Sequence, residues 1–201
     1  MTGRVSRAGL LRRGVAGSGV LLLSGSAVSV LATAAGAATI PDSDVAYLRL
    51  LVGAELLAVD FQTQALASGK LTPELATAIK QMLAQEKAHY NSLSTLITGA
   101  GQVPPTADDI NFTYPKRSFG SEDSMLKRAT PLETLTLGAY LGAVENLQTP
   151  QLRLPIGQIA ANEAQHVSAT AVAAGKPIIG RAFAPALQID AVSTALDAYE
   201  S

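Results

Sequence analysis

Two Glu-x-x-His motifs hold the only two histidines of this 201-residue chain. Glu86 precedes His89 in "AQEKAH", and Glu163 precedes His166 in "ANEAQH". Residues three apart on a helix share a face, so each motif presents a carboxylate and an imidazole to the same side. Both groups are ligands for divalent transition metals. The spacing therefore predicts that each motif contributes two metal ligands.

Both motifs lie on the apolar face of their segments. The other apolar positions are Ile79, Met82, Leu83, Leu93 and Leu96 around the first motif, and Ile156, Ile159, Ala160 and Val167 around the second. A carboxylate buried without a partner is strongly destabilising, so a buried glutamate needs a compensating charge or hydrogen bond. A divalent metal would compensate both carboxylate and imidazole. The alternative is a plain helical bundle in which Glu–His pairs are buried polar contacts.

Four segments with apolar residues at helical spacing follow residue 44, over about 45–68, 73–98, 129–147 and 150–174. Abundant alanine and leucine, 4% aromatic residues and no tryptophan favour close-packed helices over a β-sandwich. The segment between the second and third helices, residues 99–130, is long and contains Pro104-Pro105, which is typical of a crossover between helix pairs. We therefore predict an all-α fold: a four-helix bundle with a long crossover between helices two and three.

The second and fourth segments begin alike, with "TPEL" at residues 72–75 and "TPQL" at residues 149–152. In each, 13 residues separate the proline from the motif glutamate. This self-similarity indicates two copies of one helical hairpin.

The two motifs supply four ligands, and a two-metal site needs about two further carboxylates. The 13 residues from Pro73 to Glu86 span about 20 Å of helix. A similar distance back along the preceding segment reaches Glu55, which is the only acid between Asp44 and Asp60. Glu55 is therefore a predicted ligand.

The same measure chooses between two glutamates in the second hairpin. Glu133 lies 17 residues before Pro150, against 18 in the first hairpin. Glu145 lies only five before Pro150, which places it about 10 Å from the level of Glu163 and excludes it. The predicted metal ligands are Glu55, Glu86, His89, Glu133, Glu163 and His166.

Two further side chains, Asp60 and Tyr140, lie within reach of these ligands, although core or surface roles are the simpler expectation. After the fourth segment, "AFAP" at residues 182–185 is expected to pack across the bundle. Residues 189–199 are expected to form a short amphipathic helix.

The first 38 residues contain four arginines, all before Gly14, and no acidic residue. From Gly14 on, this segment is an uncharged run that ends in "AGAA". This pattern predicts an export signal, and residues 39–201 are then the mature domain. Arg12-Arg13 resembles a twin-arginine signal, which uses the export machinery for folded proteins and leads to the periplasm, the cell envelope or secretion. An ordinary secretory signal and a retained membrane anchor are the alternatives.

The remainder of the chain has 11 basic and 16 acidic residues, a net charge of −5. An acidic body gives no case for nucleic-acid binding. The chain has no cysteine, which excludes disulfides and thiolate metal sites.

The six-ligand pattern resembles the ferritin-like superfamily, in which four helices contribute Glu, Glu-x-x-His, Glu and Glu-x-x-His to a dinuclear iron or manganese centre. More narrowly, "DSDVAYLRLLVGAELLAVDFQ", "LETLTLGAYLGAV" and "NEAQHVSA" are similar to the ferritin-like domain shared with plant desiccation-related proteins and exported bacterial proteins. The likeness covers about residues 42–190. It implies that Glu86 and Glu163 bridge two metal ions, that Glu55 and Glu133 are terminal ligands, and that His89 and His166 each bind one ion.

By this resemblance, the protein is expected to be an exported oxidoreductase that reacts with oxygen species or ferrous iron, in a ferroxidase-like or catalase-like way. The alternative is a non-catalytic metal-binding or stress-protective protein of the envelope. The sequence leaves open the metal, the electron donor and the oligomeric state.

Overall fold

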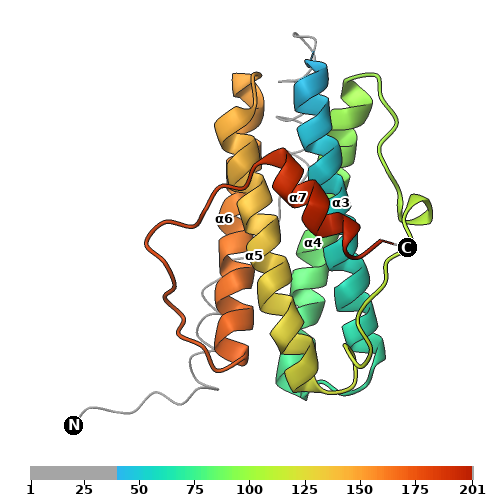
Figure 1. Ribbon diagram of the computed structural model, residues 1–201, viewed down its shortest axis with the longest axis vertical. Helices are drawn as coiled ribbons and strands as arrows, with labels where there is room; N and C mark the ends of the chain where they lie inside the picture. The colour runs from blue at the N-terminus through green and yellow to red at the C-terminus, as the bar shows by residue number, and fades with distance from the viewer. Residues whose placement is uncertain (1–39, 201) are drawn as a thin grey trace.

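Four long helices run side by side along the length of the protein (Figure 1). They are α3 (Asp42–Ala67), α4 (Pro73–Gly99), α5 (Glu122–Asn146) and α6 (Pro150–Ala173). The computed structural model describes residues 40–200, and the predicted export signal lies outside these residues. The prediction of an all-α four-helix bundle is confirmed. Within residues 40–200, no helix combines the length and the apolar character needed to cross a membrane.

The bundle consists of two helical hairpins, because α3 packs mainly on α4 and α5 mainly on α6. The first hairpin turns at Gly69, whose φ of 64° lies in the left-handed region that glycine adopts at little cost. Thr72 then precedes Pro73, the first residue of α4, where a missing backbone N–H has no consequence. The two predicted hairpins are thus present.

The crossover is shorter than predicted, because α5 begins at Glu122 rather than near residue 129. Ser121 caps the helix, because its hydroxyl accepts a hydrogen bond from the backbone N–H of Ser124 at 3.1 Å. In return, the hydroxyl of Ser124 accepts a hydrogen bond from the backbone N–H of Ser121 at 3.0 Å. Serine in place of the usual glutamate or glutamine makes this capping box hard to recognise in the sequence. Pro131 lies inside α5 and does not end it. The crossover between α4 and α5 contains the short 3-10 helix η1 (Ala107–Asp109).

Asp44, near the start of α3, ties the two hairpins together. Its side chain is fully buried, and its two oxygens accept hydrogen bonds from the backbone N–H groups of Gln148 and Thr149 at 2.9 and 2.8 Å. These N–H groups precede α6, so the carboxylate satisfies donors that the helix leaves free. Asp44 thereby sets the axial position of α3 relative to α6.

The chain after α6 returns over the bundle, and α7 (Ile189–Asp197) lies across α3 and α5 (Figure 1). Val192 and Leu196 of α7 are buried, which confirms the predicted amphipathic helix. The expectation that "AFAP" packs across the bundle is wrong for its aromatic residue, because Phe183 is 90% exposed. Contact with α5 is made instead by the backbone at Leu187, whose N–H donates to the Gly138 carbonyl at 2.9 Å.

Two glycines of α5 allow this close approach. A Cβ at Gly142 would overlap the carbonyl of Leu187, and one at Gly138 would lie 2.7 Å from its side chain. The absence of a Cβ at both positions therefore lets the C-terminal segment rest directly on the α5 backbone.

We predict that Gly142→Ala displaces Leu187 and loosens α7, with a loss of about 1–3 kcal/mol in unfolding free energy. Gly157→Ala in α6 is the matched control, because a Cβ there would meet its nearest neighbour at an ordinary 3.9 Å. The control is expected to be neutral or to stabilise by about 0.5–1 kcal/mol. Urea unfolding of both variants measures the difference, and equal stability would contradict the role of Gly142.

Candidate metal centre

All six predicted ligands lie together inside the bundle. α3 and α5 contribute one glutamate each, and α4 and α6 contribute one Glu-x-x-His motif each. None of the six residues is more than 6% exposed. The rejected Glu145 is exposed, as expected for a residue near the end of α5.

The six side chains form two overlapping groups of four. The His89 group contains Glu55, Glu86, His89 and Glu163, and the His166 group contains Glu86, Glu133, Glu163 and His166. Within each group, one ligand atom from every residue lies within 4.8 Å of the others. Glu86 and Glu163 belong to both groups, because each has two carboxylate oxygens to offer.

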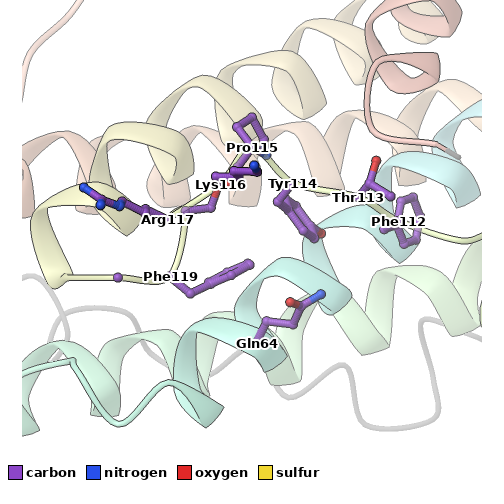
Figure 2. Close-up of a pocket in the computed structure, with 10 residues that line it drawn as sticks. Gln64, Phe112, Thr113, Tyr114, Pro115, Lys116, Arg117 and Phe119 are labelled. Carbon is purple, nitrogen blue, oxygen red and sulfur yellow. The ribbon is translucent and has the colours of Figure 1, made fainter.

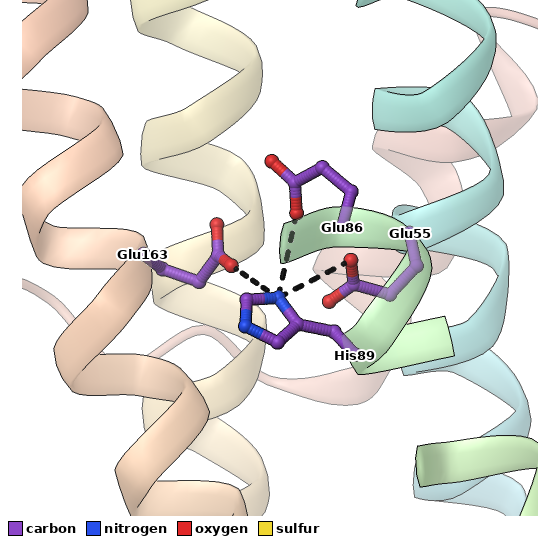
Figure 3. Close-up of side chains that lie close together, drawn as sticks. All are labelled: Glu55, Glu86, His89 and Glu163. Carbon is purple, nitrogen blue, oxygen red and sulfur yellow. Dashed lines mark ion pairs between the residues drawn. The ribbon is translucent and has the colours of Figure 1, made fainter. Parts of the chain in front are cut away.

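In the His89 group, Nδ1 of the imidazole faces three carboxylates (Figure 3). It lies 3.0 Å from Oε1 of Glu163, 3.5 Å from Oε2 of Glu86 and 3.6 Å from Oε2 of Glu55. Three helices thus converge on one ring nitrogen.

The His166 group repeats this arrangement. Nδ1 of His166 lies 3.0 Å from Oε1 of Glu86, 3.4 Å from Oε2 of Glu163 and 3.6 Å from Oε2 of Glu133. Each shared glutamate therefore directs one oxygen at each imidazole, which is the arrangement expected of a carboxylate that bridges two ions.

Hydrogen-bond donors from α3 and α5 hold three of the glutamates. The Tyr140 hydroxyl donates to Oε1 of Glu55. The Gln62 amide donates to Oε1 of Glu86 at 2.9 Å and to Oε1 of Glu133 at 3.2 Å. Tyr140 therefore contacts the site, whereas the sequence favoured a simple core role.

Asp60, the other neighbour considered from the sequence, does not contact the ligands. Its Oδ2 accepts hydrogen bonds from Tyr114 at 2.8 Å and Gln64 at 2.7 Å. Gln62 was missed, although a signal existed: it lies seven residues after Glu55, as Tyr140 lies seven after Glu133. Seven residues are about two helical turns, so both donors share a face with a ligand.

Gln85 of α4 contacts the second imidazole. Its Oε1 lies 2.8 Å from Nε2 of His166. An amide oxygen only accepts, so Nε2 carries the proton in this contact and Nδ1 faces the carboxylates. Metal-bound histidines are usually oriented in this way by a partner on the second nitrogen. Gln85 was also missed by the sequence analysis.

Several atoms of the six residues have no hydrogen-bond partner. Of the nine buried side-chain polar atoms without one in residues 40–200, seven belong to the six residues of the centre. They are Oε2 of Glu55, Glu86 and Glu133, both oxygens of Glu163, and Nδ1 of His89 and His166. Buried polar atoms are rarely left without a partner, and a shared set of this kind fits metal ions. The residues present therefore fit a dinuclear metal site.

Burial and mutual repulsion shift the acid–base properties of the centre. Burial, reinforced by the charge of Glu86, raises the pKa of Glu133 to about 8. Burial likewise raises the pKa of Glu55 well above its ordinary value. Burial alone would lower the pKa of His89, but the charge of Glu55 and the closeness of the three carboxylates around Nδ1 raise it to about 12. In the metal-free protein, protons thus supply the positive charge that the carboxylates need.

We predict that the metal-free protein loses stability as the pH rises. The pKa of Glu133 is raised from 4.5 to about 8 in the folded state. Its contribution to the free energy of unfolding is therefore complete below pH 4.5 and is lost as the pH rises through 8. The folded-state pKa of His89 is also raised, so His89 adds a slope of the same sign as its unfolded imidazole loses its proton near pH 6.5, and this part of the slope is common to the wild type and the variants. Between pH 5 and 6.5, Glu133→Gln is expected to reduce the slope by up to about 1 kcal/mol per pH unit.

Glu145→Gln on the surface of α5 is the control and is expected to leave this slope unchanged. Chemical unfolding of chelator-treated protein across this range measures both variants. An identical slope for Glu133→Gln and the wild type would contradict a protonated Glu133 in the folded state.

A surface hollow lies between the crossover and α3 (Figure 2). It is lined by Gln64 of α3 and by residues 112–120, and by none of the six ligands. The aromatic rings of Tyr114 and Phe119 in its lining meet edge to face, with their centroids 5.1 Å apart, and Tyr114 also lies 5.8 Å from Phe61 between ring centroids. The hollow offers exposed basic side chains but no convergent set of ligands, so the buried centre is the better candidate for chemistry.

Comparison with known protein families matches residues 43–176, more than half of the chain, to the ferritin-like domain. No curated protein matches the chain. The match spans all four bundle helices and every residue of the centre. The chain therefore belongs to the ferritin-like domain family.

Proposed function

We propose that the protein binds two divalent ions, of iron or manganese, at this centre. His89 and Glu55 would bind one ion, and His166 and Glu133 the other. Glu86 and Glu163 would bridge the two. The observation that carries this proposal is that these two glutamates belong to both four-residue groups, with one oxygen directed at each imidazole.

The charge of the centre supports two ions rather than one. Four carboxylates and two neutral imidazoles carry a charge of −4, which two divalent cations would neutralise. A neutral cluster is far less costly to bury than a charged one. Metal binding would replace the protons that balance the charge in the metal-free protein, so it would release protons and become tighter as the pH rises.

We propose that the metal-loaded centre reacts with dioxygen, peroxide or ferrous iron. When bound, iron or manganese supplies electron transfer to small oxygen species. The six residues would hold the ions and exclude bulk water, and Gln62, Gln85 and Tyr140 position their side chains through hydrogen bonds. The burial of every ligand supports small substrates, because the most exposed of them, His89, is only 6% exposed.

Metal content is the first test. Protein loaded anaerobically with Fe²⁺ or Mn²⁺ is expected to contain close to two ions per chain by elemental analysis. Replacing Glu86 and His89 together by alanine is expected to abolish binding of both ions, because Glu86 belongs to both groups. Glu145→Ala, which alters an exposed glutamate of α5, is expected to keep two ions.

A double variant that still binds two ions would overturn the assignment. If the wild type binds two ions, consumption of ferrous iron with dioxygen, or of peroxide, distinguishes the ferroxidase-like from the catalase-like version. Bound metal without turnover in either assay would instead favour the non-catalytic, protective function that the resemblance to desiccation-related proteins also implies.

We also propose that the protein is exported through its arginine-rich N-terminal segment. Support comes from the sequence of residues 1–38, which lacks acids and has Arg12-Arg13 before a long uncharged run. Lysine at both Arg12 and Arg13 is expected to retain the protein in the cytoplasm, as measured by cell fractionation. Lysine at Arg4 and Arg7 is the charge-matched control. Unchanged export of the Arg12/Arg13 variant would point to an ordinary secretory signal.

A further inference from the structure

The repeat allows the two halves of the centre to be compared position by position. Corresponding residues are 77 apart in α4 and α6, and 78 apart in α3 and α5. The ligand pairs are Glu86 with Glu163, His89 with His166, and Glu55 with Glu133. The same offsets pair Gln85 with Asn162 and Gln62 with Tyr140. The ligands are thus identical in the two halves, whereas the side chains that hold them differ.

The two imidazoles differ in the hydrogen-bond partner of Nε2. Gln85 of α4 reaches across to α6, and its Oε1 lies 2.8 Å from Nε2 of His166. For His89, no partner of Nε2 is found among residues 40–200, and the corresponding residue, Asn162, makes no side-chain hydrogen bond there. Asn162 is one methylene shorter than Gln85. His166 is therefore held with Nδ1 toward the carboxylates, whereas within residues 40–200 no side chain restrains His89 in this way.

The glutamates of the two groups also differ in the hydrogen-bond donors that hold them. The Gln62 amide has two N–H donors, and it contacts both Glu86 and Glu133, two glutamates of the His166 group. Tyr140, at the corresponding position, has a single O–H and contacts only Glu55. A hydroxyl in place of an amide thus leaves Glu163 without the donor that its counterpart Glu86 receives.

Ligands that are already held in place lose less conformational freedom when they bind an ion, which raises affinity. Two hydrogen bonds are unique to the His166 group, from Gln62 to Glu133 and from Gln85 to His166, while the bond from Gln62 to Glu86 holds a glutamate that both groups share. The bond from Tyr140 to Glu55 is the one unique to the His89 group. The more ordered group should bind its ion first.

We propose that the two metal positions are inequivalent, that the position at His166 fills first, and that Gln85 is the positioning residue that sets this order. This inference rests on the proposed function, namely that the centre binds two ions. It adds an order of filling that the symmetric ligand set alone does not predict.

Anaerobic calorimetric titration of the metal-free full chain with Mn²⁺ tests the order. The wild type is expected to show two steps, and at one equivalent its electron paramagnetic resonance spectrum is expected to be that of isolated Mn²⁺ rather than of coupled pairs. Gln85→Ala is expected to weaken the first step by about 10–100-fold, the usual effect of removing a partner from a metal-binding histidine. Gln85→Glu keeps an acceptor for Nε2 and is expected to retain the tight first step.

Asn162→Ala, at the corresponding position of α6, is the matched control and is expected to change neither step. A single step in the wild type, or a loss with Asn162→Ala as large as that with Gln85→Ala, would overturn the order while leaving the two-ion centre intact. A wild-type protein that binds no ion would overturn the proposed function itself, and this inference with it.

Discussion

The fold depends on a single constraint: four glutamates must be kept inside a bundle of apolar helices. Such burial is tolerable only if each carboxylate meets positive charge or a hydrogen-bond donor. The two histidines supply the charge, and Gln62 and Tyr140 supply donors from neighbouring helices. Because these groups come from all four helices, the polar centre also specifies how the helices must align. A shift of one helix along its axis would leave a buried carboxylate unpaired.

Duplication of one hairpin explains how a short chain builds a two-sided centre. Each hairpin contributes a glutamate from its first helix and a Glu-x-x-His motif from its second, so the two imidazoles face a shared pair of carboxylates. The two hairpins differ at the positions around the ligands, as Gln62 and Tyr140 show. The two halves of the centre therefore present the same side-chain types in different surroundings.

Contacts away from the metal centre also hold the four helices together. Asp44 joins α3 to the start of α6, and α7 covers the seam between α3 and α5. Gly138 and Gly142 have no side chain, so the backbone at Leu187, just before α7, lies directly against α5. These contacts lie away from the ligands, yet they restrain the helices that carry them.

The sequence by itself determined the local and repeated features of this protein. Helical spacing put Glu86 and His89 on one face, and counting from the helix breaks singled out Glu55 and Glu133 over Glu145, because helical rise converts residue number into height. Tertiary structure alone decided which side chains meet across helices. Gln85 contacts His166, Gln62 contacts Glu86, and Phe183 stays exposed, because the rotation and axial offset of neighbouring helices are set by packing of the whole bundle rather than by the period of any one segment.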